Sequence, residues 1–267
     1  MIAKEIFSRI GTNVIRDNSR NWWQNSITKM KIALLGYGKM GMAIEEVALQ
    51  HGHKIVLKVN IDNLEDNTIE NIQKADVAIE FTGPDSAFEN VKRCMDAEVP
   101  VVCGSTGWLH QLEEAKAYCK NKNGALLYAS NYSVGVNIFF ALNKTLASLI
   151  APHKEYDVAV TEIHHTQKKD APSGTAITLA EQILEKLTQK KKWINNQSNS
   201  PDDLVILSER IDPAAGTHRV QYSSAIDDIE IIHTAHNRKG FATGALLAAE
   251  FIHNKKGFFS MSDVLGI

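Results

Sequence analysis

A short apolar run, a glycine-rich turn and a helix follow one another directly at residues 31–50, and this order constrains the fold more than any other feature of the chain. In the pattern G-x-G-x-x-G, the first glycine permits a tight turn, the second lets a pyrophosphate approach the backbone, and the third allows the helix to pack closely on the strand. The motif therefore predicts a dinucleotide-binding turn, with a glycine-rich turn that binds nothing as the alternative. The turn consists of Gly36, Tyr37, Gly38, Lys39, Met40 and Gly41.

Strands and helices continue to alternate after this turn. The run 31–35 predicts the first strand, and the apolar spacing in 42–50 predicts a helix. Further strands are expected at 55–59, 76–82, 99–104 and 124–130, and further helices at 86–97 and 109–121. Because such a rhythm needs right-handed crossovers, it predicts a doubly wound, Rossmann-like parallel sheet.

The second half of the chain has a different rhythm. Helices are expected at 136–149, 174–190 and 241–253, and β-rich runs lie at 156–165, 204–211, 217–224 and 228–235. The last three runs are closely spaced with turn residues between them, which indicates a mostly antiparallel or mixed sheet. The polar stretch 190–203 is expected to be a surface loop. The expected fold class is therefore α/β, with a second, α+β domain that contains a mixed sheet.

Charge and composition exclude several classes of protein. The 267 residues contain 29 Lys and Arg against 31 Asp and Glu, so no basic excess points to nucleic acid or to an anionic membrane. No apolar stretch is long enough for a transmembrane helix, and three cysteines without C-x-x-C spacing suit a reducing, cytoplasmic compartment. Residues 1–29 lack the apolar core of a secretory signal, so we expect a poorly ordered extension or an early start codon, with a targeting role as the alternative.

The end of the second expected strand bears on which nicotinamide dinucleotide binds. An acidic residue there bonds the ribose 2′-hydroxyl of NADH, whereas a nearby cation accepts the 2′-phosphate of NADPH. Asn60 stands at this position, Asp62 follows it, and Lys39 and Lys58 supply positive charge. This mixed signal leaves NADPH and NADH both open, and Asp62 is equally well explained as a turn residue.

Residues 162–176 form the most informative segment, EIHHTQKKDAPSGTA. It places His164, His165 and Lys168 at the end of a β-rich run. A histidine titrates near neutral pH and is a common proton donor, and a lysine can hold an anion or donate a proton. The turn at 172–175 then opens a helix whose hydroxyl side chains can cap it and whose first amides can bind a carboxylate.

Less specific explanations exist for the same residues. An adjacent histidine pair is by itself more often structural than catalytic, and His164 and His165 face opposite sides if their strand is regular. No metal site is expected, because no third ligand has a suitable spacing and His233 and His236 belong to a separate strand. A catalytic role is nevertheless favoured, because the histidine pair, Lys168 and an anion-binding helix start lie close together in a chain that also has a dinucleotide turn.

The segment resembles the signature of the 4-hydroxy-tetrahydrodipicolinate reductase (dihydrodipicolinate reductase) family, E-x-H-H-x-x-K-x-D-A-P-S-G-T-A, and matches it at every named position. The resemblance runs from Met30 to Ile267. It is supported by GYGKMG, IEFTGPDS, CGSTGW, SNYSVGVN, AGTHRVQY, HNRKGFATGALLAAEFI and MSDVLGI. Two departures, a turn one residue shorter than in many relatives and Asn60 in place of a frequent acid, concern cofactor preference rather than the reaction.

This resemblance implies a role for each candidate site residue. His164 is the expected proton donor, and Lys168 a second donor or a partner of a substrate carboxylate. Substrate carboxylates are also expected at His165, Gly174 and Thr175, and the pyrophosphate at Gly36–Gly41. The nicotinamide half of the site is expected to be lined by Phe81, Thr82, Gly104, Ser105, Thr106, Ser130, Asn131, Tyr132 and Ser133. Core packing is the alternative role for Phe81, and helix N-capping for Ser133.

The implied reaction is the NAD(P)H-dependent reduction of (2S,4S)-4-hydroxy-2,3,4,5-tetrahydrodipicolinate to tetrahydrodipicolinate with loss of water, in lysine and diaminopimelate biosynthesis. Residues 30–131 with 241–267 are expected to bind the dinucleotide, and 132–240 to bind the small dicarboxylate substrate and build a homotetramer. The alternatives are a dinucleotide-binding sensor without turnover and another oxidoreductase, such as an aspartate or amine dehydrogenase. Those dehydrogenases share the glycine turn but lack the His-His-x-x-Lys segment.

Overall fold

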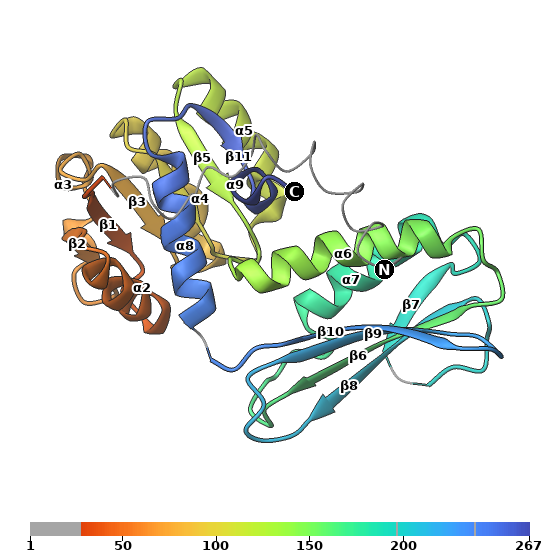
Figure 1. Cartoon of the computed structure of the whole chain (residues 1–267). Helices are drawn as coiled ribbons and strands as arrows, with labels where there is room; N and C mark the ends of the chain where they lie inside the picture. Colours follow the sequence, from red (N-terminus) through yellow and green to blue (C-terminus); the bar gives the residue numbers. More distant parts are fainter. Residues whose placement is uncertain (1–27, 196, 238) are drawn as a thin grey trace, which may run out of the picture.

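The computed structural model describes residues 28–195, 197–237 and 239–267, which form two units, each built on its own sheet (Figure 1). The first unit contains a parallel sheet and the second a mixed sheet, so the expected fold class is confirmed. Most of the expected extension, residues 1–27, lies outside the described residues. Among the described residues, no helix has the length and apolarity needed to cross a bilayer.

The first sheet has six strands, and every neighbouring pair is parallel. The strands are β1 (Lys31–Leu35), β2 (Lys54–Val59), β3 (Val77–Glu80), β4 (Val101–Cys103), β5 (Ala125–Tyr128) and β11 (Gly257–Phe259), in the order β11-β5-β4-β3-β1-β2. The order runs from β1 to β2 on one side and from β3 to β11 on the other, so the turn that follows β1 lies where the strand order reverses, and ligands of doubly wound sheets bind at such a point.

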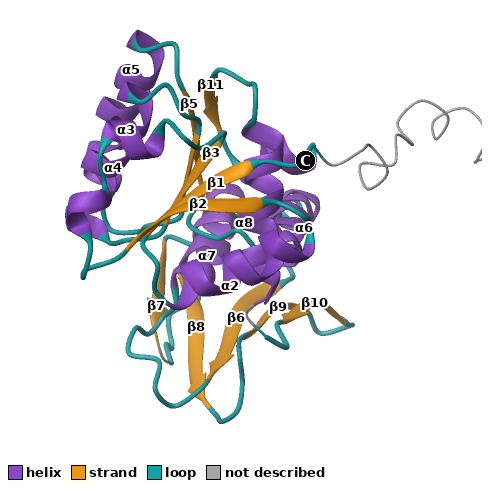
Figure 2. Cartoon of the chain, turned by 90° about the vertical axis from the view of Figure 1, so that its left-hand side faces the viewer, coloured by secondary structure: helices purple, strands orange, loops and turns teal. Residues whose placement is uncertain are grey.

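Helices cover both faces of this sheet. They are α2 (Lys39–Gln50), α3 (Ile69–Ile72), α4 (Pro84–Asp96), α5 (Leu112–Asn121), α8 (Lys239–Ile252) and α9 (Met261–Leu265), with 3₁₀ turns η1 (Leu64–Asp66) and η2 (Leu109–Gln111). Figure 2 shows α3, α4 and α5 together on one side. In β1, Ile32 and Leu34 enter the core with α2 and α8, whereas Ala33 and Leu35 enter the core with α4. Burial on both faces explains why apolar runs predicted these strands.

The second sheet has five strands in the order β10-β9-β6-β8-β7. Its elements are α6 (Val134–Ile150), β6 (Asp157–His164), α7 (Gly174–Lys186), β7 (Lys192–Asn195), β8 (Asp203–Arg210), β9 (Thr217–Ser223) and β10 (Asp228–Thr234). β6 pairs in parallel with β8 and antiparallel with β9, which makes the sheet mixed. α6 and α7 pack on one face of it (Figure 1), where Val158 and Val160 of β6 join their core.

Several short elements differ from the sequence-based expectation, among them η1 and α3, where no element was expected. The stretch 190–203 is not entirely a loop, because Lys192–Asn195 forms the edge strand β7, whose Trp193 and Ile194 are surrounded by lysines and asparagines that conceal the β signal. β11 and α9 were not expected, since three and five residues are too few to show a period. The helix expected at 174–190 ends at Lys186.

The chain passes between the two units twice. It first crosses at Tyr132 and Ser133 into α6, and it returns after β10 into α8, which packs on the first sheet (Figure 1). The two crossings lie side by side, because Cβ atoms built at Gly240 and Gly244 of α8 lie 3.7 Å from Ser133 Oγ and 1.7 Å from the carbonyl oxygen of Tyr132. Only a glycine permits this approach, and it holds both connections at one place.

Candidate active site

The glycine turn after β1 has the geometry that a bound pyrophosphate needs. A Cβ atom built at Gly36 lies 2.2 Å from the carbonyl oxygen of Phe81, and one built at Gly41 lies 2.6 Å from the carbonyl oxygen of Gly36. A side chain at either position would therefore clash with the backbone. Gly38 differs, since open space surrounds its Cβ position and it precedes α2 without any side-chain cap. The first amides of α2 therefore face open space and suit an anion.

Of the two lysines near the expected adenosine half of the dinucleotide, one is paired with an acid and the other is exposed. Lys58 Nζ lies 2.6 Å from Glu45 Oε1 and 4.7 Å from the centre of the Tyr37 ring. The hydrogen bond with Lys58 lowers the pKa of Glu45, so this pair is ionic and the charge of Lys58 is largely balanced. Lys39 is exposed at the start of α2. Asn60 at the end of β2 uses its side-chain oxygen to accept the amide of Asp62 at 2.6 Å.

The nicotinamide end is organised by Glu80, a buried residue to which the sequence reasoning gave no role. Its carboxylate accepts the Thr82 amide at 2.9 Å, the Ser105 hydroxyl at 3.1 Å and the Cys103 thiol at 2.9 Å. Burial, with Glu80 adding to it, raises the pKa of Cys103, which therefore remains a thiol donor. Glu80 thus ties the loop after β3 to the loop after β4.

Close packing fixes the aromatic side chain in the same place. A Cβ atom at Gly104 lies 2.2 Å from the Phe81 ring, so the ring lies flush against this glycine. The Phe81 ring also packs on Tyr132, with ring centres 5.6 Å apart. Phe81 is half-buried and packs against the core, which fits both the expected cofactor contact and the core role given as its alternative.

Two of the four residues in the segment 130–133 line a cavity between the two units, and the other two do not. Tyr132 is buried, and its hydroxyl donates to the carbonyl oxygen of Cys103 at 2.7 Å. Ser133 is the N-cap of α6, where its Oγ accepts the Val136 amide at 3.4 Å. Ser130 and Asn131 line the cavity between the units. Tyr132 and Ser133 therefore do not line the cavity but fix the backbone next to the two residues that do.

A cavity of about 660 Å³ lies between the two units and brings most of the expected catalytic segment together. From the second unit, His164, His165, Lys168, Gly174 and Thr175 all line it. From the first unit it is lined by Thr106, Ser130 and Asn131. The glycine turn, Asn60, Phe81, Thr82, Gly104 and Ser105 do not line this cavity and lie along the carboxyl edge of the first sheet beside it.

The two adjacent histidines reach the same cavity because the strand ends between them. β6 ends at His164, so His165 belongs to the following loop and escapes the alternation of a regular strand. Within β6, Glu162 and His164 are two residues apart and both are buried on the side of α7. The distance between Glu162 Oε2 and His164 Nδ1 is 3.4 Å. His164 and His165 therefore do not lie on opposite faces of one regular strand, as the alternation of a strand would require.

Lys168 lies at the rim of the cavity beside Asp170, with its Nζ 2.8 Å and 2.9 Å from the two carboxylate oxygens. Arg210 at the end of β8 donates to the carbonyl oxygen of Asp170 at 2.6 Å. Burial lowers the pKa of His164, and the charges of Lys168 and Arg210 lower it further against an opposing effect of Glu162. Lys168 and Arg210 therefore place two positive charges at the site, each beside an acidic residue, Asp170 and Glu162 respectively.

The start of α7 presents free amides to the cavity. Ser173 caps the helix by accepting the Ala176 amide at 3.2 Å, and its own amide donates to both carboxylate oxygens of Glu162, at 3.1 Å and 3.0 Å. The backbone beyond this cap opens at Gly174, whose Cβ position has no neighbour within 4 Å. Gly174 and Thr175 therefore suit a carboxylate group of a ligand.

Sequence reasoning missed two further histidines of the cavity, His218 and His233. Strand register brings them there, because His218 of β9 pairs with Glu162 of β6 on one side and with His233 of β10 on the other. Burial, with the charge of His164 adding to it, lowers the pKa of His218 to about 4, so this ring is neutral near pH 7. The only signal in the sequence was that each histidine occurs in an alternating β-rich run.

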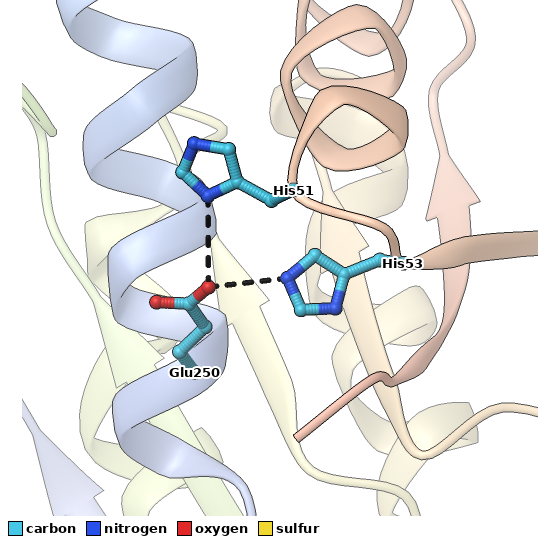
Figure 3. A group of neighbouring side chains, drawn as sticks. All are labelled: His51, His53 and Glu250. Carbon is cyan, nitrogen blue, oxygen red and sulfur yellow. Dashed lines mark hydrogen bonds and ion pairs between the residues drawn. The ribbon is translucent and has the colours of Figure 1, made fainter. Parts of the chain in front are cut away.

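Within the part of the chain that the structure describes, two groups of potential metal ligands have their candidate atoms within 4.8 Å of one another: Glu162, His164 and His218, and His51, His53 and Glu250. Figure 3 shows both rings of the second group directed at the Glu250 carboxylate. The Met30 amide donates to His53 Nδ1 at 3.1 Å, so Nε2 carries the proton, which it donates to Glu250 at 3.1 Å. This tautomer has no lone pair for a metal at Nε2. The absence of a metal remains a prediction.

Comparisons with known proteins agree with this architecture. The family model described as "Dihydrodipicolinate reductase, N-terminus" matches residues 30–132, and the one described as "Dihydrodipicolinate reductase, C-terminus" matches residues 135–265. The chain is 48% identical over 236 residues to the 4-hydroxy-tetrahydrodipicolinate reductase of Christiangramia forsetii, covering 88% of this chain and 98% of the relative. It is 37% identical over 198 residues to the enzyme of the same name from Methanoregula boonei, covering 73% and 76%.

Among solved structures, a dipicolinate-bound dihydrodipicolinate reductase from Paenisporosarcina sp. TG-14 has the same fold, with a TM-score of 0.67, 23% identity, and coverage of 87% of this chain and 98% of that one. A myo-inositol 2-dehydrogenase from Lactobacillus plantarum shares the fold more distantly, with a TM-score of 0.54, 11% identity and coverage of 85% and 89%. Since both halves of the chain match, the protein belongs to the dihydrodipicolinate reductase family.

Proposed function

We propose that this chain reduces (2S,4S)-4-hydroxy-2,3,4,5-tetrahydrodipicolinate to tetrahydrodipicolinate with NADPH or NADH and loss of water, in lysine and diaminopimelate biosynthesis. One observation carries the proposal: the His164–Lys168 segment and the start of α7 line the same cavity as Thr106, Ser130 and Asn131 of the dinucleotide unit. A reductase needs its proton donor and its anion-binding groups on one side of the substrate and the cofactor on the other. Family membership and the 48% identical relative support it.

The dinucleotide is held by the first unit in this proposal. Gly38 and the first amides of α2 bind the pyrophosphate, and the loops tied together by Glu80 present Thr82, Ser105 and Thr106 to the nicotinamide. Both cofactors are accepted, because Lys39 offers an exposed charge for a 2′-phosphate and Asn60 places no carboxylate where that phosphate would lie.

The substrate is a cyclic dicarboxylate, and the cavity supplies two separate places for its anionic groups. One is the start of α7 at Gly174 and Thr175, and the other is the rim at His165 and Lys168. Each is a charge-assisted contact. The Paenisporosarcina enzyme, which is described as dipicolinate bound, indicates a ligand of the same chemical class.

Catalysis by the residues of this chain consists of orientation and proton transfer. When bound, the dinucleotide would supply hydride chemistry, and reduction at C4 of the conjugated imine that is left after loss of water gives an enamine. His164 then donates a proton to C3 of the resulting enamine from the cavity side of its ring, and the neighbouring positive charges stabilise the carboxylates throughout. His164 and Lys168 are the proposed catalytic residues.

The assembly is proposed to be a homotetramer built through the second sheet, within the domain 132–240. Among the described helices, α6 and α7 pack on one face of this sheet, and the opposite face exposes Leu207 and Ile232, with 37% and 52% of their surfaces accessible. Such apolar exposure favours association of copies. Light scattering of the purified chain tests this, and a monomer would contradict it. A cytoplasmic location is proposed with it, in keeping with three buried free cysteines.

A coupled assay tests the activity. The upstream synthase generates the substrate in place, and oxidation of NADPH and of NADH is followed in parallel by absorbance. Oxidation that depends on the synthase supports the proposal. Cofactor binding without oxidation would favour the dinucleotide sensor, and oxidation of aspartate or an amine with NAD in the absence of the synthase would favour the other dehydrogenases.

A further inference from the structure

Glu162 is a buried carboxylate that the proposed reaction leaves without a role. Its side chain has no accessible surface and lies on β6 two residues before His164. The Ser173 amide donates to both of its oxygens, and Arg210 Nη2 lies 3.4 Å from Oε1. A buried carboxylate is costly unless it is bonded in this way. Its position therefore calls for an explanation beyond packing.

The carboxylate of Glu162 also lies next to the imidazole ring of His164. Glu162 Oε2 lies 3.4 Å from Nδ1 of His164, an ion-pair distance, and this nitrogen forms no hydrogen bond within the described residues. We propose that Glu162 is a positioning residue for His164: its carboxylate holds the proton of Nδ1 and directs Nε2 into the cavity. The inference rests on the proposed role of His164 as proton donor.

The surroundings of the opposite nitrogen agree with this orientation. A Cβ atom at Gly216 lies 3.1 Å from His164 Nε2, so Nε2 faces a stretch of cavity wall that carries no side chain. The ring of His218 packs against that of His164 at an angle of 73°, with 5.1 Å between ring centres. Nδ1 thus lies near a buried acid, whereas Nε2 lies beside a glycine that lines the cavity.

The proton balance is simple in this arrangement. Protonated His164 gives its Nε2 proton to carbon and becomes neutral with the remaining proton on Nδ1, where Glu162 accepts the hydrogen bond. Burial acts to raise the pKa of Glu162, but hydrogen bonds from Ser173 and Ser208 hold it below its usual value. Glu162 therefore stays ionised and takes up no proton during the reaction.

The charged neighbours of His164 each raise or lower its pKa. Glu162 on the same strand and Asp170 on the next loop favour the protonated ring, whereas Lys168 on that loop and Arg210 on β8 oppose it. His218 on β9 is neutral near pH 7, and burial lowers the pKa of His233 on β10 as well. Removing Glu162 and removing Arg210 should therefore shift the titration of His164 in opposite directions.

The experiment compares Glu162→Gln with Arg210→Gln in the full chain, and Glu181→Gln on the exposed side of α7 is the charge-matched control. The pH profile of kcat falls as pH rises through the pKa of His164, because the donor must be protonated. Glu162→Gln is expected to move this limb about one pH unit lower. Arg210→Gln is expected to move it higher, and Glu181→Gln to leave it unchanged.

Imidazole nitrogen NMR supplies a readout that needs no turnover. With the His164 signals identified from their loss in His164→Gln, the wild-type ring is expected to be the Nδ1–H tautomer when neutral. Its pKa is expected to fall in Glu162→Gln and to rise in Arg210→Gln. An Nε2–H tautomer in the wild type, or a His164 pKa that is the same in all three variants, would overturn the positioning role. Full turnover by His164→Gln would instead overturn the proposed proton donor, so the two failures are distinguishable.

Discussion

The carbonyl oxygen of Phe81 occupies the space that a side chain at Gly36 needs, since a Cβ atom built there lies 2.2 Å from it. Gly36 also has a φ angle of +97°, which side chains disfavour. This contact joins the end of β1 to the end of β3, so the turn that faces the dinucleotide is held by the fold itself.

Gly36→Ala is accordingly expected to damage the fold. Strain at a positive φ and the clash with backbone atoms should lower the free energy of unfolding by about 2 kcal/mol or more. Urea unfolding followed by circular dichroism measures it. A variant as stable as the wild type would show that the turn is free to move away from β3.

Gly38→Val tests the neighbouring glycine with the opposite expectation. Its Cβ position is surrounded by open space, so the folded chain tolerates valine and the melting temperature should change little. The side chain would fill the place of the pyrophosphate, and NAD(P)H binding measured by fluorescence titration should be lost. Unchanged titration would refute the pyrophosphate assignment, and Gly36→Ala provides the contrasting control.

His164→Gln should reduce kcat by about 10²- to 10⁴-fold, the range expected for loss of a general acid. NAD(P)H affinity should remain, because the ring belongs to the second unit. Steady-state kinetics and cofactor titration separate the two effects. Turnover close to that of the wild type would remove His164 from the mechanism.

Stability should depend on pH through His218. Its pKa is lowered from 6.5 to about 4 by burial, so the unfolded chain takes up a proton first as pH falls. The stability contributed by the neutral ring is full above about pH 6.5 and is lost progressively down to about pH 4. In His218→Gln, the loss of unfolding free energy between pH 7 and pH 5 should be smaller by about 2 kcal/mol than in the wild type. Equal losses, measured by urea unfolding at one protein concentration, would contradict it.

Glu80→Gln should loosen the nicotinamide end. The amide group presents donors where the Cys103 thiol or the Ser105 hydroxyl also donates, so at least one hydrogen bond is lost at a cost of about 1–3 kcal/mol. KM for NAD(P)H should rise, and kinetics with saturating substrate measure it. Glu89→Gln on the exposed side of α4 is the control. A normal KM in Glu80→Gln would limit Glu80 to a structural role.

Local patterns were sufficient to predict some of this structure. The glycine turn and the strands around it follow from spacing within short segments, and the Pro-Ser-Gly-Thr turn predicted a cap at Ser173 or Thr175, which Ser173 provides. The meeting of His164 with Lys168 and Gly174 in one cavity also follows from their nearness in the sequence.

Contacts across the sheet could not be predicted in this way. His218 and His233 reach the cavity through the pairing of β9 with β6 and with β10, and a sequence does not state register. The opposite-face argument for His165 failed because it assumed that the strand continued past His164. Glu80 gave no sign of its importance, since its donors come from Thr82 after β3, from Cys103 at the end of β4 and from Ser105 in the loop after β4.

The adjacency of the two crossings, where Gly244 lies against Tyr132, limits how the cavity can open. Two connections that pass each other at one place form a single pivot between the units. The wall that carries His164 and the wall that carries Thr106 and Ser130 can therefore separate without parting the units at that pivot.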